Sequence, residues 1–157
     1  LEFFRPLLHG GVVREAYARL APEPTEALYS LSRSIMKGPL PAALRELLAV
    51  QVSQINRCAH CIEVHWKKAL KAGVQEQKLR LLPAYREAAA YTEEELVALD
   101  LAETVTFLSR AGVPATLWER VRFAFPDEEV RLHLLYQIIL MNSWNRLSVA
   151  LALDPPG

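Results

Sequence analysis

The sequence PAALRELLAVQVSQINRCAHCIEVHWKKALKAG occupies residues 41–73 and predicts two consecutive helices. Pro41 suits the first turn of a helix, where its missing N–H costs nothing. Apolar side chains then recur at helical spacing as far as Ile55, and small or apolar residues also occupy the other side. A helix that is apolar on nearly all sides is usually buried. We therefore expect this first helix to lie at the centre of the fold or at a subunit contact.

The second helix carries both cysteines of the chain near its N-terminus. We expect it to run from about Cys58 to Ala72, with Asn56 as its N-cap. Gly73 suits the left-handed backbone conformation that ends many helices. The two thiols therefore belong to the first turn of a helix.

Cys58, Cys61 and His65 are separated by three and four residues, so they share one helical face. The free N–H groups and the dipole at a helix N-terminus favour a thiolate, which is the nucleophilic form of cysteine. The CxxC spacing also lets the two sulfur atoms approach bonding distance. This pattern predicts reversible two-electron thiol chemistry.

Two further residues are candidates for this site. If the chain reverses as an antiparallel helix pair around Asn56, Glu46 of the first helix lies beside His65. A carboxylate there could orient the imidazole and hold a proton taken from Cys61. His60 lies between the cysteines and faces solvent by periodicity, unless a loop or another chain covers it.

The rest of the chain also predicts helices, and no stretch shows the period-two alternation of a strand. Thr92 with Glu95 forms a capping-box pattern, and Asp127 begins an acidic first turn that suits a helix N-terminus. We expect one all-α domain over residues 1–157. Its further helices are expected from after Pro24 to Lys37, near 75–82 and 83–90, and over 92–109, 115–123 and 127–153.

Composition excludes several classes of function. Eighteen basic and eighteen acidic residues give a formal net charge of zero, which disfavours binding to nucleic acid or to an acidic membrane surface. No apolar run approaches the ~20 residues of a membrane span, and residues 1–11 lack the features of a secretory signal. Two cysteines so close together are a poor disulfide framework, so we expect a cytoplasmic protein. Because the sequence begins at Leu1, the true N-terminus stays open.

Each candidate residue also has a purely structural interpretation. The cysteines and His65 could be core residues, and Glu46 could be a surface carboxylate. Alternatively, Cys58, Cys61 and His65 could bind a structural zinc ion with Glu46 or His60, which would make the chain a binding or assembly module. A catalytically silent oligomeric scaffold is a further alternative.

The pattern of Glu46, eleven intervening residues, Cys58-Ala59-His60-Cys61, three intervening residues and His65 resembles a known family. It is similar to the AhpD-like alkylhydroperoxidases within the carboxymuconolactone decarboxylase superfamily. The apolar helix ending at Asn56 and the segment Asn142 to Arg146 also resemble peroxidase-related members. The resemblance implies an all-α fold of about seven to eight helices, with the CxxC pair at the N-terminus of a central helix.

The resemblance also implies a thiol peroxidase that needs no metal or organic cofactor. Cys61 would attack the peroxide and become a sulfenic acid, and Cys58 would resolve it to a disulfide. His65 and Glu46 match the proton-relay positions of the family, and His60 matches a histidine found between the cysteines in some members. The implied partners are a small hydroperoxide, a lipoylated or thioredoxin-like dithiol reductant, and further copies of the chain as a trimer, hexamer or dimer.

The order of the two cysteines is in tension with the helix dipole. Dipole reasoning makes Cys58, which is nearer the N-terminus, the more acidic thiol, whereas the resemblance assigns the attack to Cys61. We follow the resemblance because His65 lies one turn after Cys61. A disulfide oxidoreductase without peroxide activity remains an alternative, whereas lactone decarboxylation is disfavoured because related decarboxylases lack the CxxC pair.

Overall fold

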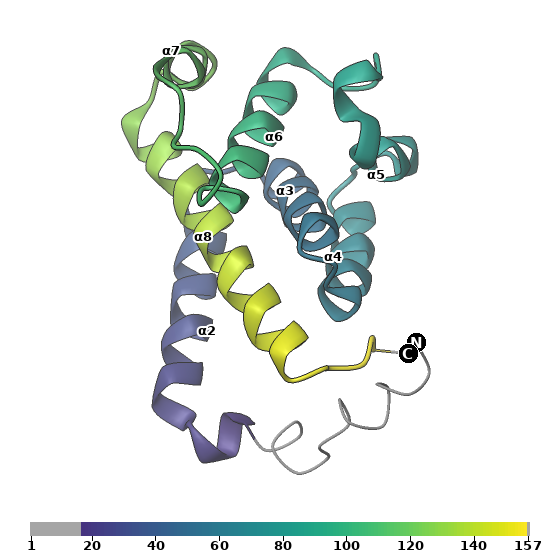
Figure 1. Cartoon of the computed structure of the whole chain (residues 1–157), viewed down its shortest axis with the longest axis vertical. Coiled ribbons are helices and arrows are strands. Elements are labelled where there is room, and N and C mark those ends of the chain that lie inside the picture. The colour runs from purple at the N-terminus through teal and green to yellow at the C-terminus, as the bar shows by residue number, and fades with distance from the viewer. Residues whose placement is uncertain (1–16, 157) are drawn as a thin grey trace.

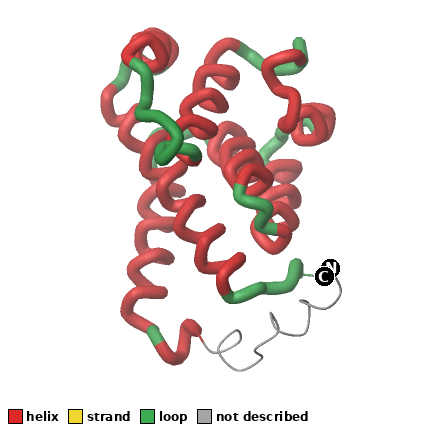
Figure 2. Tube along the Cα trace, in the orientation of Figure 1, coloured by secondary structure: helices red, strands yellow, loops and turns green. Residues whose placement is uncertain are grey.

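The chain forms helices joined by short turns in the computed structural model, which describes residues 17–156 (Figures 1 and 2). The helices are α2 (Pro22–Lys37), α3 (Ala42–Ile55), α4 (Ala59–Lys71), α5 (Glu76–Leu81), the 3-10 helix η3 (Leu82–Glu87), α6 (Glu93–Thr106), α7 (Ala115–Ala124) and α8 (Glu128–Ala150). Residues 17–156 contain no strand, so the prediction of an all-α fold is confirmed. The N-terminal stretch 1–11 lies outside the described residues.

Helix α3 lies at the centre of the molecule, in contact with α4, α6 and α8 (Figure 1). Every residue from Glu46 to Ser53 is buried. The apolar character on all sides of this segment therefore predicts its central position correctly. Helix α4 packs beside α3 as the second arm of an antiparallel pair, and the long helix α8 crosses the two on another side.

The turn between α3 and α4 differs from the sequence prediction. Asn56 is not the N-cap of α4, because it ends α3, and its side-chain amide lies 3.0 Å from both Asn142 and Asn145 of α8. Cys58 takes the N-cap position, where its Sγ accepts a hydrogen bond from the backbone N–H of Cys61 at 3.3 Å. The local sequence could not predict that Cys58 replaces Asn56 as the N-cap, because the hydrogen-bond partners of Asn56 are 86 and 89 residues away.

Several helix ends follow the predicted capping signals. The capping box of Thr92 and Glu95 is present, and Asp127 accepts hydrogen bonds from the first turn of α8. Gly73 has a φ of 88°, as its left-handed position requires. Pro41 is the N-cap of α3 rather than a residue of its first turn.

Other predicted bounds are wrong by a few residues. Helix α2 begins at Pro22 rather than after Pro24, α6 ends at Thr106 rather than near residue 109, and α8 ends at Ala150 rather than near residue 153. The helix predicted for 83–90 is the 3-10 helix η3, because Ala84 leaves helical geometry with a φ of −129°.

Gly38, after α2, has a role that the local sequence does not reveal. Its φ is −77°, so it does not use the left-handed conformation expected of a helix-ending glycine. A Cβ atom at this position would lie 2.2 Å from the imidazole ring of His133 on α8. The glycine is therefore required by the close approach of α2 and α8.

No helix within residues 17–156 has both the length and the apolar character needed to cross a lipid bilayer.

Candidate active site

Both cysteines lie at the N-terminus of α4 as free thiols. Cys58 is 1 % exposed and Cys61 is 4 % exposed. The first turn of α4 places the two side chains within hydrogen-bonding reach of each other. The spacing predicted from the sequence thus brings the two sulfur groups together.

The two thiols have opposite acidities. The hydrogen bond between them holds the pKa of Cys61 down to about 6, against the effect of burial. The same hydrogen bond, together with burial, raises the pKa of Cys58 well above its ordinary range. Cys58 therefore holds its proton more strongly, and Cys61 is the thiol that ionises more readily. This order removes the tension with the helix dipole, because the thiol pair and not the position along the helix decides which sulfur ionises.

Helix α8 contributes a third group to the thiolate site, Ser148. Its Oγ lies 3.6 Å from Cys61 Sγ, and this hydrogen bond also lowers the pKa of Cys61. Ser148 is 4 % exposed, so little water competes with Cys61 for a hydrogen bond to its hydroxyl. Sequence reasoning missed this residue, because 87 residues separate it from Cys61 and no local motif marks it.

A buried polar network fixes α8 against α3 near the thiols. The side chain of Asn145, which is fully buried, lies 3.0 Å from the hydroxyl of Ser53 and 3.0 Å from the amide of Asn56. Asn142 extends the network to Thr106 of α6 at 3.1 Å. Because polar groups in a core must find partners, these contacts specify one packing of the three helices. That packing is what brings Ser148 to Cys61.

Glu46 and His65 form the second part of the site. Glu46 Oε2 lies 2.7 Å from His65 Nδ1, so the antiparallel pairing of α3 and α4 brings together the two residues expected to be neighbours. Burial alone would raise the pKa of Glu46, but the hydrogen bond and charge of His65, with Lys68 and Arg45, hold it below its ordinary value. A carboxylate only accepts hydrogen bonds, so His65 Nδ1 carries a proton and donates it to Glu46.

His60 is half-buried instead of facing solvent freely. Its Nδ1 lies 2.6 Å from the backbone oxygen of Asp154, in the segment that follows α8. The periodicity of α4 predicts that His60 faces outward unless a loop covers it. The segment that covers it lies 94 residues further along the chain. That segment closes one side of the site.

A cavity of about 320 Å³ opens beside the thiolate. Cys61, His65, Glu46 and His60 all line it, whereas Cys58 does not. Its apolar wall is formed mainly by Tyr29, Met36, Val64, Leu140, Met141 and Trp144. A small molecule in this cavity therefore meets Cys61 and the imidazole of His65, while Cys58 is reached through Cys61.

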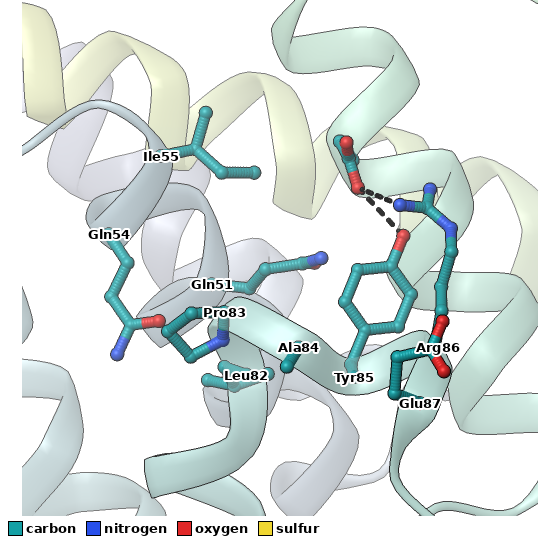
Figure 3. A pocket seen from close by; sticks show the side chains of 10 residues that line it. Gln51, Gln54, Ile55, Leu82, Pro83, Ala84, Tyr85, Arg86 and Glu87 are labelled. Atoms are coloured by element: carbon teal, nitrogen blue, oxygen red, sulfur yellow. Dashed lines mark hydrogen bonds and ion pairs between the residues drawn. The ribbon is translucent and has the colours of Figure 1, made fainter.

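A larger cavity of about 520 Å³ lies away from the thiols, between α3, η3 and α6 (Figure 3). Neither cysteine lines it. Tyr85 and Arg86 lie 2.8 and 2.9 Å from the carboxylate of Glu103. Figure 3 marks the contacts of these two side chains with dashed lines. These polar groups already satisfy one another, so we assign the chemistry to the smaller cavity that contains Cys61.

The geometry gives no support to the zinc alternative. Within residues 17–156, no three His, Cys, Asp or Glu side chains converge as a metal ion would require.

Comparison with known proteins places this site in a family. Residues 22–104 match the model of the carboxymuconolactone decarboxylase family, and these residues include both cysteines, Glu46 and His65. The chain belongs to this family. An uncharacterised protein of Bacillus subtilis (strain 168), YdfG, is 37 % identical over 138 residues, which are 88 % of this chain and 93 % of YdfG.

Solved structures identify the branch of the family. A protein from Agrobacterium tumefaciens, described provisionally as an AhpD antioxidant defence protein of unknown function, has a TM-score of 0.86 and 30 % identity. The match covers 90 % of this chain and 96 % of that protein. The chain is thus an AhpD-like member of the family, as its motif predicts.

A protein named as a debrominase has the same fold. The debrominase Bmp8 has a TM-score of 0.72 and 20 % identity, over 87 % of this chain and 73 % of Bmp8. Architecture alone therefore does not determine the reaction.

Proposed function

We propose that this protein reduces hydroperoxides through a cycle of sulfenic acid and disulfide at Cys61 and Cys58. The observation that carries the proposal is a thiolate-prone Cys61 in the wall of a cavity that also presents His65, whose ring is oriented by Glu46. A thiol with a pKa of about 6 is largely ionised at neutral pH, which is the state that attacks an O–O bond. The AhpD-like relationship supports the same reaction class.

The first step forms a sulfenic acid. The Cys61 thiolate attacks the terminal oxygen of R–O–OH, so an S–O bond forms and the O–O bond breaks. The electron pair leaves with R–O⁻, which takes a proton and departs as the alcohol. His65 takes up a proton from solvent at Nε2 and delivers it to R–O⁻, and Glu46 stabilises the imidazolium that carries this proton. The sulfur has then lost two electrons to the peroxide.

The second step forms the disulfide. Cys58 loses its proton and attacks the sulfur of the sulfenic acid, the S–O bond breaks, and water is released. The high pKa of Cys58 keeps this thiol protonated while it donates a hydrogen bond to the Cys61 sulfur. Oxidation of Cys61 removes that negatively charged acceptor, so Cys58 can then lose its proton. An external dithiol then returns two electrons by thiol–disulfide exchange. A lipoylated or thioredoxin-like protein has this chemistry.

The decisive experiment is sulfenate trapping. Reduced wild type, Cys58→Ser and Cys61→Ser are treated with limiting peroxide in the presence of dimedone and analysed by mass spectrometry. We expect a dimedone adduct on residue 61 of the Cys58 variant, an intramolecular disulfide in wild type, and neither product in the Cys61 variant. An adduct on Cys58 alone, or oxidation no faster than that of a free thiol, would overturn the proposal.

A disulfide oxidoreductase without peroxide activity uses the same two sulfur atoms, so it is the second candidate. It predicts rapid exchange with disulfide substrates and no acceleration of peroxide reduction. The cavity beside Cys61 favours the peroxidase, because it gives a small molecule direct access to this sulfur.

A further inference from the structure

The cavity beside Cys61 has an asymmetric charge distribution. Its lining includes three permanent cations, Arg33, Arg45 and Lys68, and one carboxylate, Glu46. The rest of the wall is mainly apolar and aromatic. The cavity therefore combines an apolar interior with an excess of positive charge.

Two of these cations already have partners. Arg33 pairs with Glu26, and Arg45 lies 3.4 Å from Glu46. Lys68, by contrast, has no acidic side chain within ion-pair distance among residues 17–156, although its charge contributes to the low pKa of Glu46. Lys68 is thus the cation with the greatest capacity to pair with an anion brought in by a ligand.

Lys68 stands in a fixed relation to the reacting sulfur. Cys61, His65 and Lys68 follow one another on α4 at spacings of four and three residues, and all three line the cavity. Seven residues of α-helix advance by roughly 10 Å. A ligand that fills the cavity can therefore place one end at Cys61 and the other at Lys68, with the apolar wall between them.

We propose that the preferred substrate is a hydroperoxide on an apolar carbon skeleton that carries a carboxylate on the order of 10 Å from the peroxide. The carboxylate pairs with Lys68, and the apolar wall excludes water from the skeleton between the two ends. A hydroperoxide of an unsaturated fatty acid has this chemistry. The inference rests on the proposed function, because it assigns a substrate class to the same Cys61 site.

The volume of the cavity suits such a ligand better than hydrogen peroxide. Sites for organic ligands usually occupy about 300–1,000 Å³, and this cavity has about 320 Å³. Hydrogen peroxide would leave most of the apolar wall unused.

The test compares linoleic acid hydroperoxide with its methyl ester, which has the same skeleton and peroxide but no charge. The rate of Cys61 oxidation is measured in reduced wild type, Lys68→Met and Lys71→Met, where the exposed Lys71 of the same helix does not line the cavity. We expect wild type and Lys71→Met to prefer the acid by about fivefold, the scale of one partly screened ion pair. Lys68→Met should react equally with both, and added salt should reduce only the preference for the acid.

A binding measurement separates this inference from the proposed function. The unreactive hydroxy acid that corresponds to the reduced product, and its methyl ester, are titrated into the three proteins by calorimetry. Tighter binding of the acid that is lost in Lys68→Met supports the substrate class even if peroxide turnover is absent. Equal binding or equal oxidation of acid and ester by wild type overturns the inference and leaves the peroxidase proposal standing. Failure of every peroxide to oxidise Cys61 overturns the peroxidase proposal itself.

Discussion

The pKa of Cys61 is lowered by neighbours that act from different directions, mainly Cys58 and Ser148 and also Asn145 and His60. Cys58 donates within the same helical turn, and Ser148 reaches Cys61 from α8. The first contact follows from the CxxC spacing, and the second follows from how α8 packs. The reactivity of the thiol is therefore set partly by local and partly by tertiary structure.

We predict that alkylation of Cys61 by iodoacetamide follows an apparent pKa of about 6 and rises with pH through that value, because only the thiolate reacts. Ser148→Ala should raise this pKa by about half to one unit, since one hydrogen bond to the thiolate is lost. The measurement is the rate of modification of the Cys61 peptide between pH 5 and 9. Ser143→Ala is the matched control, because the Ser143 hydroxyl bonds to the Ile139 carbonyl instead. An unchanged pKa in the Ser148 variant would contradict the role given to this hydroxyl.

We predict that Glu46→Gln slows peroxide reduction by about tenfold to a hundredfold, because the amide can hold the His65 ring but cannot stabilise the imidazolium. The pKa of Cys61 should not change, since Glu46 is not among the groups that shift it. Peroxide oxidation and iodoacetamide alkylation are therefore measured side by side. If both rates fall together, Glu46 acts on the thiol or on folding and not through His65.

The helical elements are positioned by contacts between distant segments. Helix α3 is held between α4, α6 and α8, and the asparagine network of Asn56, Asn142 and Asn145 ties the end of α3 to α8. The approach of α2 to α8 is close enough that Gly38 faces the His133 ring directly. Small changes at these contacts should therefore affect stability more than any change in helix propensity.

We predict that Gly38→Ala destabilises the protein by about 1–3 kcal/mol, because overpacking forces His133 or the backbone to move. A Cβ at residue 38 would lie 2.2 Å from the imidazole, whereas a Cβ at Gly112 meets no atom within 4 Å. Gly112→Ala is the control and should change stability by less than about 0.5 kcal/mol. Urea unfolding of the two variants provides the measurement, and equal effects would show that the His133 contact is not tight.

At the scale of the whole molecule, α8 leaves an apolar stripe on the surface. Leu132, Tyr136 and Ile139 recur at helical spacing and are 49 %, 49 % and 47 % exposed. Exposed apolar stripes commonly mark contacts between chains. We propose that this stripe forms a contact between copies of the chain.

We predict that Ile139→Glu lowers the molecular mass of the assembly in solution, because a buried carboxylate at a subunit contact is costly. Analytical ultracentrifugation of wild type and variant measures the mass. Phe123→Glu on α7, where the side chain is 90 % exposed, is the control. A wild-type monomer would contradict self-association, and an unchanged oligomer in the Ile139 variant would place the contact elsewhere.

The amino-acid sequence by itself determined the helical class, the central position of α3 and the grouping of Cys58, Cys61 and His65 on one face. These features depend on periodicity and on spacings of three and four residues, which are local properties. The neighbourhood of Glu46 and His65 also followed from the sequence, because a short turn between two helices fixes their pairing.

Only the tertiary structure decided why residue 38 is glycine and that Asn56 faces α8 instead of capping α4. It also placed Ser148 beside Cys61, the segment after α8 over His60, and Lys68 in the lining of the cavity that contains Cys61. These features depend on contacts between residues up to 95 positions apart, and no local pattern records such contacts. The physical reason is that pKa values and close packing respond to distance in space, which the order of residues does not specify.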